Sequence, residues 1–150
     1  MNINLAIIKG AKVLKENFIN NPYLDSEILM AKVINKDRKY LLLNSDIYLE
    51  NKDLNFFQKL IKKRSLGKPI AYLTNKKFFW KSEFNVSDST LIPRPDTELV
   101  VEKVLDLTVN KKKLNILEIG IGSGCILLSI LKERKSFYGT GIDISKSCLK

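Results

Sequence analysis

Apolar residues in the first part of the chain recur with the spacing of amphipathic helices. Over residues 5–18 they form one stripe, and lysines occupy most of the opposite face, which predicts a helix. Pro22 is well placed to begin a second helix, residues 40–43 predict a short third one, and a fourth begins near Asn51 and ends in three basic residues. The pattern therefore predicts a helical bundle over residues 1–66.

Residues 67–90 differ from the helical region in their pattern of apolar and polar residues. Short segments rich in aromatic and β-branched residues, at 70–73, 77–80 and 84–86, alternate with polar stretches. Such segments predict a β-hairpin that links two domains. The aromatic residues at 78–80 are expected to pack at the seam between those domains.

The most informative pattern lies between Leu114 and Asp143. A short apolar run over 114–119 ends at a cluster of glycines, and apolar residues resume at Cys125 without a turn former. A second apolar run, 137–142, ends at Asp143. This order predicts a buried strand, a tight turn, a helix and a second strand, the arrangement that opens a nucleotide-binding α/β domain.

The glycines of the turn indicate a ligand site. Gly120, Gly122 and Gly124 have no Cβ and can adopt positive φ, so a ligand can lie against the backbone where the helix begins. Asp143 follows Gly124 by 19 residues, at the tip of the second strand, where a carboxylate can accept hydrogen bonds from both ribose hydroxyls. The spacing indicates an adenosine ligand. A glycine-rich turn in some other α/β protein is the alternative that the motif leaves open.

The segment Leu91–Glu98 has an unusual density of special residues. Pro93 and Pro95 restrict the backbone around Arg94, and Pro95 is well placed to begin a helix that ends at Leu107. Two interpretations remain open, a rigid helix entry and a rigid loop that lines a cofactor pocket.

Charge and composition narrow the chemistry. The net charge is +10, but 22 of the 26 basic residues are lysines spread along the chain, which predicts a solvated lysine surface rather than a required nucleic-acid site. The sequence contains no histidine, which removes the usual general base and excludes most hydrolase triads. Hydrophobic residues make up 45% of the chain, so we expect a globular protein.

The two cysteines and the apolar runs set further expectations. Cys125 and Cys148 are too few and too far apart in sequence for a disulfide framework or a metal site, so no metal is expected. No apolar run approaches the ~20 residues that cross a bilayer, and the first residues lack the features of a signal peptide. We therefore expect a cytoplasmic protein with no membrane partner.

Four motifs, in chain order, resemble the HemK/PrmC family. These enzymes are protein-(glutamine-N5) methyltransferases that modify the Gly-Gly-Gln loop of bacterial peptide chain release factors. The resemblance covers the whole chain, and its most specific part is the proline-arginine-proline run. The motifs are Gly67–Thr74, Phe79-Trp80, Leu91–Glu98 and Ile116–Ile126.

The resemblance implies an α/β protein with three parts. Residues 1–66 would form a helical domain that docks the release factor, and residues 67–90 a β-hairpin linker. Residues 91–150 would begin a class I, Rossmann-like methyltransferase domain that uses S-adenosyl-L-methionine.

The same resemblance implies roles for individual residues. The turn from Gly120 to Gly124 would cradle the methionyl end of the cofactor, Glu118 would support its amine indirectly, and Asp143 would hold the ribose. The cofactor-binding set is thus Glu118, Gly120, Ile121, Gly122, Ser123, Gly124 and Asp143. The pocket-flanking set is Pro93, Arg94, Pro95 and Thr97.

One family feature is absent from the sequence. Family members carry an Asn-Pro-Pro-Tyr motif after their fourth strand, which holds the substrate amide, and these 150 residues do not contain it. We therefore assign no catalytic residue, and we expect an amino-terminal portion of a methyltransferase, or a decayed gene product, that is inactive alone. With only two strands of the family's sheet present, the strand at Leu114 would lack the neighbours that bury both of its faces.

Two alternatives to the release factor assignment remain open. The first is a methyltransferase for adenine in nucleic acid or for glutamine in a ribosomal protein. The second is a non-catalytic fragment whose helical domain binds a partner.

Overall fold

The computed structural model describes residues 1–149, and the chain separates into two compact units, Met1–Thr74 and Asn75–Lys150. Lys150, the last residue of the expected methyltransferase portion, lies outside the described residues. The segment expected as a linker, 67–90, is divided between the units at Thr74. We describe each unit by itself.

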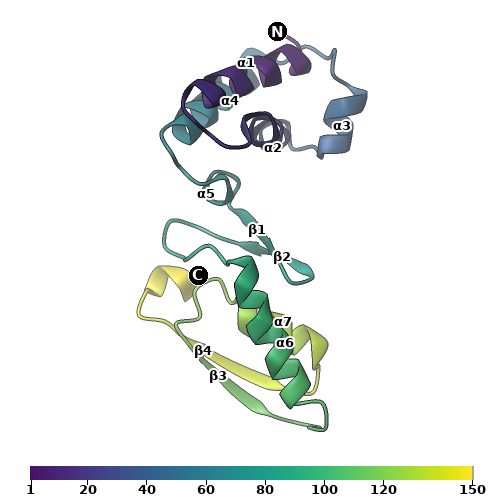
Figure 1. Ribbon diagram of the computed structural model, residues 1–150, viewed down its shortest axis with the longest axis vertical. Coiled ribbons are helices and arrows are strands. Elements are labelled where there is room, and N and C mark those ends of the chain that lie inside the picture. The colour runs from purple at the N-terminus through teal and green to yellow at the C-terminus, as the bar shows by residue number, and fades with distance from the viewer. Residues whose placement is uncertain (150) are drawn as a thin grey trace. The chain divides into compact units, whose positions relative to one another are not determined.

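The first unit is built of helices (Figure 1). The four predicted helices are present, but the first runs over Ile3–Glu16 rather than 5–18. Its core face is not the predicted stripe, since Ile8 is 48% and Phe18 93% exposed. Asn2 and Asp37 cap the first and third, because their side-chain oxygens accept the amides of Leu5 and Tyr40. The five helices are α1 (Ile3–Glu16), α2 (Pro22–Ile34), α3 (Arg38–Leu43), α4 (Asn51–Ser65) and α5 (Ile70–Thr74).

Helix α5 corrects one prediction. Residues 70–73 were expected to belong to the β-hairpin because they are apolar and partly β-branched, but they form a helical turn. The Pro69 carbonyl accepts the amides of Tyr72 and Leu73, and the Thr74 hydroxyl donates to the Ile70 carbonyl. Leu73 is buried in the core of the helical unit, so local turn geometry and tertiary packing outweigh β-propensity here.

The helical unit has a single core in which α1, α2 and α4 contact one another. They come close together at Gly10, because a Cβ built there would lie 2.6 Å from Ser26 Oγ and 2.8 Å from Phe57 Cζ. The Ser26 hydroxyl donates to the Ile7 carbonyl at 2.8 Å, which satisfies this polar group inside the core. The buried core residues are Ile3, Ala6, Ile7, Leu14, Leu29, Met30, Leu41, Phe57, Leu60, Ile61 and Leu73.

Replacing Gly10 by alanine should destabilise the helical unit. Helix propensity favours alanine by about 1 kcal/mol, but overpacking at this contact costs about 2 kcal/mol, so we expect a net loss of roughly 1 kcal/mol. Urea unfolding followed by far-ultraviolet circular dichroism measures the change, with the exposed Lys12→Ala on the same helix as control. A more stable Gly10→Ala variant would show that the helices are not in close contact at this point.

The second unit contains a hairpin, two longer helices and a pair of parallel strands (Figure 1). The predicted order of strand, turn, helix and strand is confirmed, and β3 and β4 pair in parallel with Glu118 opposite Gly141. The expectation that the first strand is buried is wrong, because its residues alternate between exposed and partly buried. The helix expected to begin at Asp96 starts as a 3₁₀ turn and becomes α-helical at Glu98. The elements are β1 (Lys76–Phe79), β2 (Ser82–Asn85), η1 (Pro95–Thr97), α6 (Glu98–Leu107), β3 (Asn115–Ile119), α7 (Cys125–Glu133), β4 (Tyr138–Ile142) and η2 (Lys146–Leu149).

The hairpin packs into the core of the second unit. Phe79 is buried there and Trp80 packs against the same cluster, so these rings do not fit the predicted role at a seam between domains. The backbone amide of Trp80 donates to Glu98 at 2.8 Å, and its indole N–H donates to Glu133 at 2.9 Å. The hairpin turn is therefore hydrogen-bonded to the start of α6 through Glu98 and to the end of α7 through Glu133.

One face of the β3–β4 sheet is covered and the other is open. Helix α7 packs against β4, on the face to which Glu118 and Gly141 belong. On the opposite face the side chains of Leu117, Ile119 and Ile142 are exposed, Ile119 by 76%. Within residues 1–149, β3 pairs with β4 alone.

Candidate functional site

The glycine turn between β3 and α7 has the backbone conformation that the sequence predicts. Gly120, Gly122 and Gly124 all have positive φ, at 77°, 53° and 73°, which L-residues with side chains adopt only at a cost. The amides of Gly120 and Ile121 both donate to the Ile142 carbonyl, at 2.8 and 3.1 Å. These hydrogen bonds hold the turn against the end of β4.

The turn leaves its backbone open on one side. A Cβ built on Gly120 or Gly122 would have no heavy atom within 4 Å, although at Gly141, across the sheet, it would lie 2.0 Å from Ile121 Cδ1. The Ile121 side chain thus fills the space beside β4 and leaves the outer side of the turn free. A ligand can reach the main chain of Gly120 and Gly122 there.

Asp143 lies against the turn, as the spacing predicts. Its Oδ2 accepts the Gly122 amide at 2.9 Å, and its Oδ1 accepts the Ser145 amide at 2.8 Å. These two N–H groups hold the pKa of the Asp143 carboxyl below its ordinary value. The carboxylate is partly exposed, so it can also contact a ligand.

Glu118 brings a second acid to the start of α7. Its Oε2 accepts the Leu127 amide at 3.0 Å, which satisfies a free donor in the first turn of the helix. Burial raises the pKa of the half-buried Glu118 carboxyl, and the hydrogen bond from Leu127 opposes that shift. The two acids give this end of the sheet a negative potential that suits a cationic ligand.

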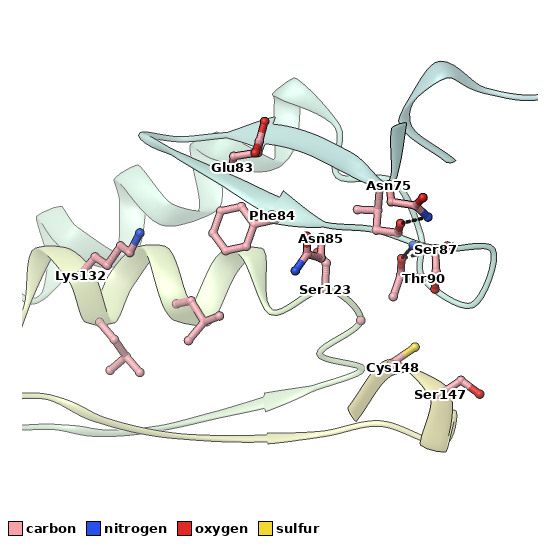
Figure 2. Close-up of a pocket in the computed structure, with 14 residues that line it drawn as sticks. Asn75, Glu83, Phe84, Asn85, Ser87, Thr90, Ser123, Lys132, Ser147 and Cys148 are labelled. Carbon is pink, nitrogen blue, oxygen red and sulfur yellow. Dashed lines mark hydrogen bonds between the residues drawn. The ribbon is translucent and has the colours of Figure 1, made fainter. Parts of the chain in front are cut away.

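A cavity of about 740 Å³ adjoins the turn (Figure 2). Gly122 and Ser123 line it, and Figure 2 shows the Phe84 ring pointing from β2 toward α7. The cavity also has polar groups from the residue before β1, from β2 and the segment after it, and from η2, which the sequence patterns did not predict. No motif could have found them, because they come together only when the hairpin packs on α7. They are Asn75, Asn85, Ser87, Thr90, Ser147 and Cys148.

The proline-rich segment does not contribute to the lining of this cavity. Pro93 is buried, Arg94 and Pro95 are exposed, and Thr97 is partly buried; none of the four lines the cavity. Glu98, at the end of the motif, accepts the Trp80 amide, so the segment attaches the hairpin to α6. This favours the interpretation as a rigid helix entry, and the pocket-flanking role remains a prediction.

Within residues 1–149, no helix is both long and apolar enough to span a membrane. The same residues contain no group of three His, Cys, Asp or Glu side chains placed to hold a metal ion. Cys125 and Cys148 are both free thiols. Cys125 is buried in the core of the second unit, as its position in the predicted helix suggests.

Comparisons with known proteins find relatives for the helical unit and for the chain as a whole. A sequence model of the PrmC N-terminal domain matches residues 6–74. The chain is 41% identical to the release factor glutamine methyltransferase of Buchnera aphidicola subsp. Schizaphis graminum, over 100% of this chain and 54% of the relative. It is 41% identical to the Leptospira interrogans enzyme of the same name, over 95% of this chain and 50% of the relative.

A third relative has a broader name. The bifunctional methyltransferase of Rickettsia bellii is 36% identical, over 91% of this chain and 29% of the relative. The chain spans about half the length of the two release factor glutamine methyltransferases. Similarity covers the whole chain, and residues 6–74 match the PrmC N-terminal domain, so this chain is similar to proteins named release factor glutamine methyltransferases over about half of their length.

Proposed function

We propose that this chain supplies the substrate-docking domain and the cofactor half-site of an S-adenosyl-L-methionine-dependent methyltransferase. Its substrate would be the glutamine side-chain nitrogen in the Gly-Gly-Gln loop of a peptide chain release factor. The observation that carries the proposal is the open glycine turn flanked by Glu118 and Asp143, in a chain 41% identical over its full length to a release factor glutamine methyltransferase.

The residues present fit the cofactor. The methionyl carboxylate would lie where α7 begins, because free amides and the helix dipole favour an anion there. Glu118 and Asp143 supply negative charge for the ammonium and sulfonium groups. Each Asp143 oxygen accepts one amide and retains a lone pair for a ribose hydroxyl. When bound, S-adenosyl-L-methionine supplies a methyl group activated by its positive sulfur.

No residue among these 150 is assigned to hold the substrate amide. A neutral amide is a poor nucleophile, so transfer depends on holding its nitrogen in line with the methyl group. The Asn-Pro-Pro-Tyr motif that performs this in the family is absent from the 150 residues. We therefore expect these residues, when assayed alone, to bind cofactor without methylating a release factor.

Transfer of a radiolabelled methyl group tests this expectation. The chain is incubated with labelled cofactor and a release factor, and in parallel with RNA and with ribosomal protein, and incorporation is counted. We expect no incorporation above the rate without the chain. Labelling of the release factor would show that the chain is active alone, and labelling of RNA instead would favour a nucleic-acid substrate.

Replacing Glu118 by glutamine should separate stability from cofactor binding. The amide oxygen can still accept the Leu127 amide, but the charge that is desolvated in the folded state is gone. Because the folded pKa of Glu118 is raised, wild type gains stability from this group only at acid pH and loses it as pH rises through that pKa. The variant should thus be the more stable protein at pH 7, with the difference vanishing near pH 4.

Cofactor affinity should change in the opposite direction. Loss of the Glu118 charge beside a cationic ligand should weaken binding by about tenfold at pH 7. Unfolding curves at both pH values and a cofactor titration at pH 7 measure the two effects, with the exposed Glu102→Gln on α6 as control. Equal affinity for wild type and variant would remove Glu118 from the site.

A second candidate function is favoured by the independence of the helical unit. Residues 1–74 form a compact unit with their own core, and the PrmC N-terminal domain match lies within it. The unit would then bind a release factor with no chemistry of its own. Binding by a chain of residues 1–74 would support this function, and its loss on removing residues 75–150 alone would contradict it.

A further inference from the structure

We propose that Asp143 is a positioning residue for the glycine turn. Its carboxylate accepts a hydrogen bond from the Gly122 amide and thereby holds the backbone on which the ligand lies. This role is additional to the ribose contact, and its relevance to the cofactor rests on the proposed function. The two roles would make one side chain couple the ribose end of the site to the methionyl end.

The hydrogen bonds of the turn single out this contact. The amides of Gly120 and Ile121 donate to the Ile142 carbonyl, and Gly124 donates to the Ile121 carbonyl. Among these turn residues, Gly122 is the one whose amide donates to a side chain, the Asp143 carboxylate, at 2.9 Å. The middle of the turn is thus held by Asp143, while its two ends are held by main-chain carbonyls.

The Cβ side of Gly122 is open. A Cβ built on Gly122 would meet no heavy atom within 4 Å, so beyond its chain neighbours no group lies against that side of the residue. Gly122 has φ of +53°, a region that glycine also leaves readily because its backbone is permissive. The charged acceptor supplies the restraint, since hydrogen bonds to a carboxylate are stronger than those between neutral groups.

The carboxylate engages two segments at once. Oδ2 accepts Gly122 and Oδ1 accepts Ser145, at 2.9 and 2.8 Å, so the turn is linked to the entry of η2. The lowered pKa of Asp143 arises from these two amides, with no charged side chain contributing. Because the Gly122 amide is occupied, a bound ligand would use other donors of the turn, and the remaining lone pairs of Asp143 would accept the ribose hydroxyls.

Two variants follow from this geometry. Asp143→Ala removes both acceptors. Asp143→Asn keeps the shape but has one acceptor oxygen, and its NH₂ group would face one of the two amide donors, so it should not restore the turn. Asp106→Asn is the matched control, because Asp106 is an exposed acid on α6 whose nearest ion-pair partner, Lys103, is 4.0 Å away.

Amide measurements on the ligand-free chain test the proposal directly. In the ¹⁵N-labelled protein, the Gly122 and Ser145 amide resonances should shift together as Asp143 titrates, with one midpoint below the ordinary aspartate value of about 3.9. At neutral pH, hydrogen exchange of the Gly122 amide should be at least about tenfold faster in Asp143→Ala and Asp143→Asn, and unchanged in Asp106→Asn. A Gly122 amide that neither titrates nor exchanges faster would overturn the proposal.

A binding cycle then separates the two roles. The ligands are S-adenosylhomocysteine and its analogue that lacks both ribose hydroxyls. If Asp143 contacted only the ribose, wild type and Asp143→Ala would bind the analogue equally. We expect the variant to bind the analogue about tenfold more weakly, because the turn itself is loosened. Equal affinity for the analogue would overturn the positioning role, whereas failure of wild type to bind either ligand would count against the cofactor assignment and leave the exchange result decisive.

Discussion

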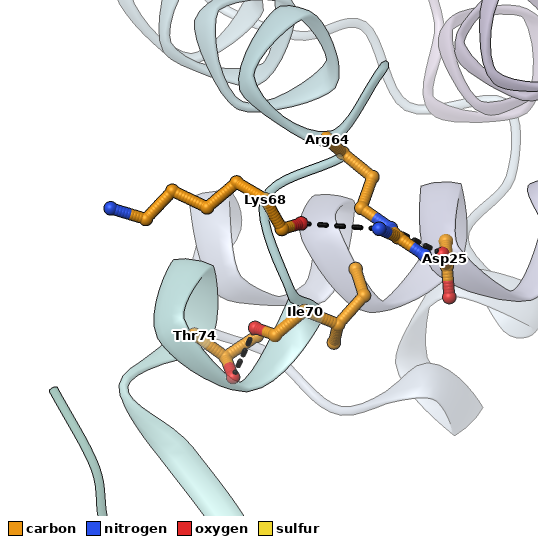
Figure 3. A network of polar contacts seen from close by, with 5 residues as sticks. All are labelled: Asp25, Arg64, Lys68, Ile70 and Thr74. Atoms are coloured by element: carbon orange, nitrogen blue, oxygen red, sulfur yellow. Dashed lines mark hydrogen bonds and ion pairs between the residues drawn. The ribbon is translucent and has the colours of Figure 1, made fainter. Parts of the chain in front are cut away.

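Replacing Asp25 by alanine is expected to lower the free energy of unfolding of the helical unit by about 3 kcal/mol. Asp25 Oδ2 lies 2.7 Å from Arg64 Nε, and the side chains are only 11% and 19% exposed. Figure 3 shows the Arg64 guanidinium between Asp25 and the Lys68 carbonyl, to which it donates at 3.2 Å. Loss of the carboxylate leaves a buried cation with a single neutral acceptor.

The location of the pair explains why the effect should be large. Asp25 belongs to α2 and Arg64 to α4, and the Lys68 carbonyl precedes α5, so one guanidinium connects three parts of the unit. Far-ultraviolet circular dichroism in urea reports the change, because most helical residues lie in this unit. Lys52→Ala is the control, since the Lys52–Glu50 pair is 75% and 71% exposed and solvent screening leaves it little effect on stability. Equal losses in the two variants would contradict the account.

Replacing Gly141 by valine should destabilise the second unit by about 3 kcal/mol, the upper part of the range for overpacking. A Cβ at this position would lie 2.0 Å from Ile121 Cδ1 and 2.9 Å from Ile121 Cγ1. Ile121 belongs to the glycine turn, so the turn must move to make room. Cofactor affinity should then fall by more than about tenfold, although Gly141 is not among the residues proposed to contact the ligand.

The fluorescence of Trp80 reports unfolding of the second unit, since it is the only tryptophan in the chain and packs against that unit's core. Thr140→Val is the matched control, because Thr140 is the neighbouring residue on the same strand and is exposed. A Gly141→Val variant with wild-type stability and affinity would show that Ile121 can leave its position without disturbing the turn.

The sequence predicts those parts of the fold that depend on local pattern. Helical spacing indicates α1, α2 and α4, supported by Pro22 at the start of α2 and by basic residues at the end of α4, because their apolar patterns are long enough to be distinguished from strands. The glycines between an apolar strand and an apolar helix indicate the turn and its positive φ values. The distance from Gly124 to Asp143 correctly places a carboxylate at the turn, because a βαβ unit brings adjacent parallel strands to the same edge.

Sequence patterns did not predict the features that depend on tertiary packing. Residues 70–73 are apolar and partly β-branched, and only their burial against the helical core shows that they form a helical turn. Phe79 and Trp80 indicate a packing surface but not which one, and Glu98 gives no sign in the sequence that it accepts the Trp80 amide.

In the candidate site, too, local sequence pattern predicts some residues and tertiary packing brings in others. Glu118, the glycines and Asp143 come from one continuous pattern, and they lie together. The polar wall of the cavity comes from segments on either side of the hairpin and from η2, which no sequence spacing relates. The hydrogen bond from Gly122 to Asp143 is likewise a product of packing, because the spacing indicates only that the two residues are near each other.

Calorimetric titration of the chain with S-adenosyl-L-methionine tests the central claim, that the glycine turn forms a cofactor half-site. We expect saturable binding, weakened at least about tenfold in Gly122→Ala, because a Cβ would enter the open space at the turn and strain a residue with φ of +53°. Asp106→Asn should bind as wild type does. Absence of binding by a chain whose Trp80 fluorescence shows a folded second unit would contradict the claim.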